Sequence, residues 1–158
     1  MATQYTAGLS AGQVLTAATM NQIGAAWETW TPALTASTTN PTLGTGSTAS
    51  GRYGRVNKTI FGQLLIQFGT AGVAQGTGFY FVSVPITAQA SGPTIGSGYI
   101  LDNSASLLRH VVAVLDSTSR MALWIDNSTS YAVSATNPFA GGWAASDSIR
   151  IDFQYEAA

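Results

Sequence analysis

One histidine and seven carboxylates are the residues of this 158-residue chain whose types could carry acid–base chemistry. Nucleophilic catalysis by a serine needs a neighbouring base, and His110 is the sole histidine candidate. His110 lies inside an apolar segment, 107–112, where a lone histidine is typically structural. The chain has no cysteine, which excludes disulfides, thiolate metal ligands and a cysteine nucleophile. We therefore predict no catalytic residue.

The acidic residues do not form a recognisable metal or acid–base motif. Most of the aspartates lie in or beside predicted turns, where Asp accepts hydrogen bonds from its own backbone. Asp126-Asn127-Ser128 resembles part of a calcium loop but lacks the glycine, the spacing and the distal glutamate. The glycines of 92–98 open no helix, so a phosphate-binding loop is not indicated. The sequence predicts neither a metal nor a cofactor.

The overall charge is low and nearly balanced. Only 8% of the residues are charged, and the formal net charge is −1, whereas about 25% charged residues is typical of a soluble domain. One lysine and five scattered arginines cannot form a basic patch, which excludes a nucleic-acid partner. Threonine, serine, alanine and glycine replace charge on the surface, and so neutral a surface favours self-association.

No segment is predicted to enter a membrane. The longest apolar run, Val111–Leu115, is far shorter than the roughly 20 residues of a spanning helix. The first five residues have neither the cationic start nor the apolar core of a secretory signal. We therefore expect synthesis in a cytoplasm and no membrane insertion.

Residues 1–30 form the first of two predicted units, an arm with a short helix over residues 16–27. Met20, Ile23 and Trp27 fall on one face of that helix. A helix of three turns is marginal alone, so this apolar stripe needs a partner surface. The stripe either packs on its own domain or makes an attachment or oligomer contact; we favour the second, because the segment precedes the β region like an arm.

Residues 31–158 form the second predicted unit, a mainly β domain. Trp30-Thr31-Pro32 ends the arm because the residue before proline avoids the helical region. Residues 35–51 form a loop or two weak edge strands, and Asn57-Lys58 is a hairpin turn. Short strands with turn signals about every ten residues predict an antiparallel β-sandwich or jelly roll. The predicted strands are 52–56, 59–68, 79–84, 96–101, 107–115, 120–125, 131–133 and 149–155.

The segment 137–143 carries the one surface feature with binding potential. Its glycines precede Trp143, and Phe139 lies four residues earlier. A tryptophan in a loop can stack on a sugar ring or fill a pocket in a partner. Phe139 and Trp143 are therefore a candidate ligand-contact loop. The alternative is that Trp143 packs back under the final strand.

Several stretches together carry a resemblance, namely 11–21, Trp30-Thr31-Pro32, 51–53, 56–59, 78–85, and then Trp143, Asp147 and Tyr155-Glu156. In these stretches, which cover nearly the whole chain, the sequence resembles small virion proteins of tailed bacteriophages, especially phages of actinobacteria. The resemblance implies a trimeric β-sandwich without enzyme activity, variously a head fibre, a capsid decoration or a minor tail protein.

The sequence therefore predicts a non-enzymatic structural protein, displayed on a phage particle as a capsid decoration or head fibre. The alternative is a minor tail module at the tail tip that binds a receptor or glycan; an enzyme such as a polysaccharide depolymerase ranks third. The predicted partners are two further copies of the chain in a homotrimer and other virion proteins of the capsid or tail. A host surface glycan is a further candidate. The expected location is the surface of the virion.

Overall fold

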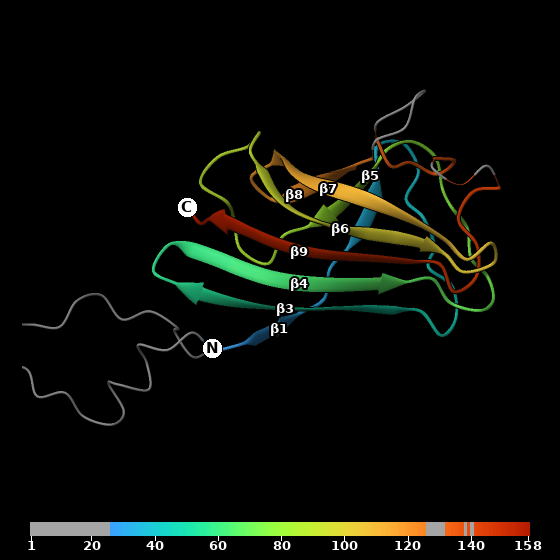
Figure 1. Cartoon of the computed structure of the whole chain (residues 1–158), viewed down its shortest axis with the longest axis horizontal. Coiled ribbons are helices and arrows are strands. Elements are labelled where there is room, and N and C mark those ends of the chain that lie inside the picture. The colour runs from blue at the N-terminus through green and yellow to red at the C-terminus, as the bar shows by residue number, and fades with distance from the viewer. Residues whose placement is uncertain (1–25, 126–131, 138, 140) are drawn as a thin grey trace, which may run out of the picture.

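The computed structural model describes residues 26–125, 132–137, 139 and 141–158. Within these residues the chain is all β, with nine strands in one antiparallel sheet and no helix (Figure 1). This confirms the predicted mainly β, antiparallel class, but not the predicted sandwich or jelly-roll arrangement. The strands are β1 (Glu28–Trp30), β2 (Leu34–Ala36), β3 (Thr48–Val56), β4 (Thr59–Gln67), β5 (Tyr80–Ser83), β6 (Thr94–Asp102), β7 (Leu107–Ser117), β8 (Arg120–Trp124) and β9 (Ser148–Glu156).

The sheet is curled, and its two edges are joined by a short covalent link. The strand order is β1-β3-β4-β9-β6-β7-β8-β5-β2, so the first two strands in sequence occupy opposite edges. Only Thr31, Pro32 and Ala33 separate them. Four residue steps reach at most about 14 Å. The edges must therefore lie close together, which requires the sheet to bend round on itself.

A sandwich of two separate sheets is not what forms. β6 pairs with β9 on one side and with β7 on the other. It therefore joins one wall of the curl, β1-β3-β4-β9, to the other wall, β7-β8-β5-β2, in one continuous sheet. The register of β6 with β7 shifts between Thr94 and Gly96, and that of β7 with β8 shifts between Leu115 and Ser117. Such irregularities increase the bend and twist of a strand. The sequence pattern shows the strands but not this pairing.

The hairpin of β3 and β4 is the most regular part of the sheet. All nine residues of each strand pair, from Thr48 with Gln67 to Val56 with Thr59. Asn57 has a φ of 59°, which asparagine tolerates better than most residues. The predicted turn at Asn57-Lys58 is confirmed.

The core lies inside the curl. On β9 the inward residues Ile149, Ile151 and Phe153 are at most 4% exposed, as their period-two spacing predicts. Tyr155, the fourth inward residue, donates a hydrogen bond through its hydroxyl to the Ile86 carbonyl at 2.6 Å. Because Ile86 follows β5, which lies in the other wall of the curl, this bond joins the end of β9 to the opposite side of the core.

An irregular antiparallel ribbon covers one end of the sheet. Residues 39–45 run beside residues 71–77 and form isolated bridges, for example from Thr42 to Ala74. The opposite end carries the turn between β3 and β4 and the end of β9 (Figure 1). The prediction of a loop or weak edge strands over residues 35–51 is thus partly right. β2 is a three-residue edge strand there, and β3 already begins at Thr48.

The sheet begins earlier than the predicted unit 31–158. Glu28–Trp30 form β1 and pair with β3, with Trp30 opposite Gly51. The Trp30 ring occupies the space that a side chain at Gly51 would fill, and it meets Phe153 edge-on at 6.2 Å. Ala26 and Trp27 are not helical. The end of the predicted helix at Trp27 is therefore wrong, while its residues 16–25 lie outside the described part.

Candidate binding groove on the outer face of the sheet

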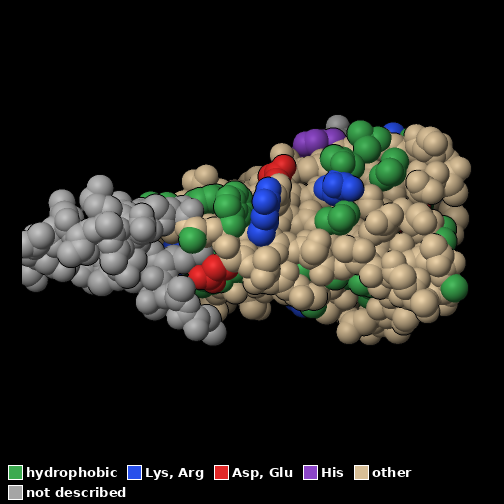
Figure 2. All heavy atoms as spheres, turned by 90° about the horizontal axis from the view of Figure 1, so that it is seen from below, with side chains coloured by type: hydrophobic (Ala, Val, Ile, Leu, Met, Phe, Trp, Pro, Cys, Tyr) green, Lys and Arg blue, Asp and Glu red, His purple; other side chains and the backbone are tan. Residues whose placement is uncertain are grey.

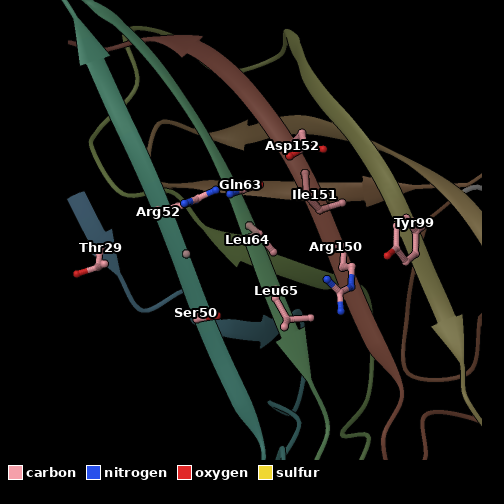
Figure 3. Close-up of a pocket in the computed structure, with 11 residues that line it drawn as sticks. Thr29, Ser50, Arg52, Gln63, Leu64, Leu65, Tyr99, Arg150, Ile151 and Asp152 are labelled. Atoms are coloured by element: carbon pink, nitrogen blue, oxygen red, sulfur yellow. The ribbon is translucent and has the colours of Figure 1, made fainter. Parts of the chain in front are cut away.

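The outer face of β3, β4, β9 and β6 carries an open groove of about 520 Å³. On β4 and β9 buried residues alternate with residues that face outward, so Leu64 and Ile151 turn their side chains to the core while Gln63, Leu65, Arg150 and Asp152 face the groove. Figure 3 shows their side chains projecting from neighbouring strands. The lining residues are Thr29, Ser50, Gly51, Arg52, Gln63, Leu64, Leu65, Tyr99, Arg150, Ile151 and Asp152.

Strand register divides the groove into two rows of different chemistry. In one row Arg150 of β9 lies between Leu65 of β4 and Tyr99 of β6 (Figure 3). In the next row Asp152 lies between Gln63, which also lines the groove, and Ser97 of β6, an exposed residue beside the groove. The first row therefore presents a guanidinium between an aliphatic and an aromatic side chain. The second presents a carboxylate beside an amide and a hydroxyl.

Arg52 lines the groove beside β1, and its side chain is held by Gln63 and by Trp27 next to the groove. When the Gln63 amide is oriented with its oxygen toward Arg52, that oxygen accepts hydrogen bonds from Nη2, at 2.6 Å, and from Nε. The Arg52 guanidinium also lies 4.8 Å from the centre of the Trp27 ring. Trp27 meets Phe61 edge-on at 5.4 Å. Arg52 is thus held by its own chain.

Most other charged side chains of the described residues also have partners. Arg120 and Asp116 form an ion pair at 2.7 Å, and Arg55 Nε donates to the Asn57 carbonyl at 2.7 Å. Glu28 accepts from the Tyr53 hydroxyl at 2.6 Å. Burial and this carboxylate raise the pKa of Tyr53 to about 12.

Arg150 and Asp152 differ from these. Each is exposed, and neither side chain has a hydrogen bond or ion pair with any residue that the structure describes. They are two residues apart on the same face of β9, with opposite charges, yet they do not pair. Both were recognisable from sequence as outward residues of the last strand. The sequence did not show that Tyr99 and Gln63 lie beside them, because this depends on the order of the strands in the sheet.

Of the predicted attachment residues, the structure describes one. Trp27 is 51% exposed and rests on the outer face of the sheet, against Phe61 and Arg52. Met20 and Ile23 lie outside the described residues. The role of this stripe stays a prediction.

The two aromatics of the candidate ligand-contact loop are buried. Phe139 is 2% and Trp143 is 4% exposed, and their rings lie 4.9 Å apart. Trp143 also stacks on Phe68 at 5.3 Å, and its Nε1 donates to the Ser134 carbonyl at 2.8 Å. In this conformation neither ring can meet a ligand. The burial supports the alternative interpretation, in which Trp143 packs inward.

His110 is not a core residue. It lies on the exposed side of β7, opposite Tyr99 of β6. The apolar segment around it belongs to a strand end whose neighbours Leu108 and Arg109 are exposed as well. Within the described residues, no three histidine, aspartate or glutamate side chains come close enough to hold a metal ion.

Asp147 is the one fully buried carboxyl group among the described residues. Its two oxygens accept hydrogen bonds from the backbone N–H groups of Asn103, at 2.9 Å, and Ala144, at 2.8 Å. Burial raises its pKa above the ordinary value, although these two bonds oppose the rise. Because it joins two loops and is closed to solvent, its position indicates a structural role.

Comparisons with known proteins identify no relative. No family model matches the chain. No curated protein and no solved structure matches it either. The residues that the structure describes include no helix long and apolar enough to cross a membrane.

Proposed function

We propose that this chain is a non-enzymatic structural protein of a bacteriophage virion, displayed on the particle surface as a capsid decoration or head fibre. The observation that carries the proposal is the polarity of the domain. The first described residues enter through β1 at the end of the sheet that holds the β3–β4 turn and the C-terminus (Figure 1). The irregular ribbon lies at the other end. Attachment at one end would present the opposite end outward.

The resemblance to phage virion proteins supplies the class of particle. It also implies a trimeric β-sandwich, in which two apolar sheet faces pack together. Here both faces belong to one curled sheet, and the walls enclose a single core. The protein would be made in the host cytoplasm and join capsid or tail proteins on the particle.

The proposed homotrimer is supported by the surface. Large apolar side chains are exposed at several places, namely Trp27, Val56, Phe79, Leu108 and Trp124, each at least 42%. Figure 2 shows one face on which only a few charged side chains lie among mostly neutral ones. A symmetric assembly would bury such apolar area at about 25 cal/mol per Å². Light scattering should give about three times 16.3 kDa; a stable monomer at micromolar concentration contradicts the trimer.

Incorporation into particles tests the display role. Particles that lack the protein should regain it when the full chain is added, and a map of the particle should show it on the capsid surface. A chain of residues 26–158 keeps β1 and Trp27 but lacks residues 1–25, which make up most of the predicted arm. It should fold and fail to incorporate. Normal incorporation of this shortened chain would show that the arm is not the anchor.

The alternative is a minor tail module at the tail tip that binds a receptor or glycan. The groove on the outer face favours this candidate, because it is a concave surface with unpaired charged groups. The same map distinguishes the two, since density at the tail rather than on the capsid would assign the chain to the tail.

A further inference from the structure

The groove holds two unused charged groups in a chain that uses most of its others internally. Arg150 and Asp152 are fixed on β9, which is paired on both sides, so their spacing is set by the strand. Residues two apart on a strand lie about 6.8 Å apart. A cation and an anion at this spacing can each bind a different group of one small ligand.

The row of Arg150 fits a carboxylate attached to a ring with an apolar face. A guanidinium donates two parallel hydrogen bonds to a carboxylate. Leu65 and Tyr99 flank Arg150 and offer apolar surfaces beside that carboxylate. An aromatic ring such as that of Tyr99 packs well on the C–H face of a sugar.

The row of Asp152 fits hydroxyl groups. An ionised carboxylate is an acceptor only, with two oxygens that can each take a hydroxyl proton. The Ser97 hydroxyl lies beside it in register, and so does the Gln63 amide, whose NH₂ remains free to donate when its oxygen binds Arg52. Donors and acceptors therefore alternate here, as a polyhydroxylated ligand requires.

We propose that this groove binds an acidic oligosaccharide, with the carboxylate of a uronic acid unit on Arg150 and its hydroxyls on Asp152. Its volume of about 520 Å³ lies within the range of about 300–1,000 Å³ common for ligand sites. The carboxylate of Asp152 disfavours strongly anionic ligands such as nucleic acids, because it repels a second negative charge close to Arg150. A single negative charge next to neutral hydroxyls suits the pair.

The test is a titration of the full-length protein with a tetrasaccharide of alternating glucuronate and N-acetylglucosamine, followed by calorimetry. Wild-type protein should bind it, and binding should weaken with added salt. The same tetrasaccharide with its carboxylates converted to methyl esters should bind about tenfold more weakly or not at all. This comparison needs no variant and so does not depend on the folding of one.

Variants then locate the site. Arg150→Gln should weaken binding of the acidic tetrasaccharide about tenfold, and it should weaken binding of the methyl ester much less. Asp152→Asn should weaken both probes, because it removes a charged acceptor of hydroxyls. The matched control is Arg109→Gln, which removes another exposed, unpaired arginine from outside the groove. It should bind as the wild type does.

Several results would overturn the proposal. These are no binding to the wild type, equal binding of acid and ester, equal loss in the Arg109→Gln control, or preference for a glutamate peptide of the same charge. The proposal does not depend on the virion role. A chain that binds the tetrasaccharide but does not join particles would keep this site and lose the display function, and the reverse result would do the opposite.

Discussion

The two faces of β9 have opposite relations to the rest of the protein. The inward side chains of Ile149, Ile151 and Phe153 are packed into the core. Arg150 and Asp152, which alternate with them along the strand, have no hydrogen bond or ion pair with any described residue. Both sets come from one nine-residue strand whose backbone is paired on both sides. Stability and surface chemistry therefore reside in alternate residues of the same strand. Substitutions there should affect one without the other.

The largest effect is expected inside, at Ile151. Ile151→Asp places an unpaired charge at a position that is 2% exposed, and such burial is among the costliest single changes. The loss should be about 4 kcal/mol or more, a large part of the roughly 5–15 kcal/mol by which native domains are stable. Circular dichroism and thermal melting measure it. A variant that melts as the wild type does would show that this face is not the core.

The next effect should occur at the far end of the core, at Trp143. Trp143→Ala removes the ring contacts with Phe68, Tyr80 and Phe139 and the hydrogen bond to Ser134. Truncating a buried aromatic costs about 3–5 kcal/mol. Chemical denaturation should show this loss. If Trp143 instead served as an exposed ligand contact, stability would be nearly unchanged.

Asp147 tests the contribution of the one fully buried carboxyl group among the described residues. Because burial raises its pKa, the protonated form is favoured in the folded state, so the stability that it contributes is complete below the ordinary value of 3.8. That contribution is lost as the pH rises through the raised pKa. The free energy of unfolding of the wild type should therefore fall relative to Asp147→Asn as pH rises from about 3 to 7. A constant difference across this range would contradict the pKa direction.

The comparison with Asp147→Asn is needed because a neighbouring carboxyl behaves in the opposite way. Asp102 accepts hydrogen bonds from the Ser104 hydroxyl and from the Ala105 backbone N–H. These bonds lower the pKa of Asp102, and the Ser104 hydroxyl contributes most. The contribution of Asp102 to stability is present above the ordinary pKa and is lost as pH falls. Since both proteins contain Asp102, the difference between them isolates Asp147.

The smallest effect is expected outside. Arg150→Ala and Asp152→Ala should each change the free energy of unfolding by less than about 0.5 kcal/mol, because neither side chain has a described partner to lose. Denaturant titration measures this. A loss above 1 kcal/mol at either residue would mean that the outer face carries stability too, and the contrast between the faces would fail.

The strands with clear period-two patterns were predictable from the sequence. β4, β7 and β9 lie close to their predicted ranges, because each carries a continuous row of inward apolar residues. β1 was missed, and β2 was anticipated only as part of a loop or two weak edge strands, since three residues are too few to show a period. Their place in the sheet depends on partners far along the chain: Thr29 pairs with Arg52, and Thr35 pairs with Phe81.

The candidate site was predictable only in part. The outward position of Arg150 and Asp152 follows from the pattern of one strand. The groove does not, because it requires β4 and β6 to lie on either side of β9, and sequence order places neither next to it. Phe139 and Trp143 show why the sequence left two interpretations of their loop open. Glycines suggested an open loop, but the Trp143 ring stacks on Phe68, from a segment far away in the sequence, and Phe139 packs on Trp143.

The three-residue link between the edges of the sheet has a mechanical consequence. If the chain is held by its N-terminal arm, a pulling force enters at Trp27 and acts along β1. The three residue pairs of β1 with β3 would then be loaded together, in shear, rather than opened one by one. Any remaining load passes through Thr31–Ala33 to β2 and from there to β5, on the opposite wall. A single tether would therefore load strands at both edges of the sheet, because β1 and β2 are consecutive in the chain.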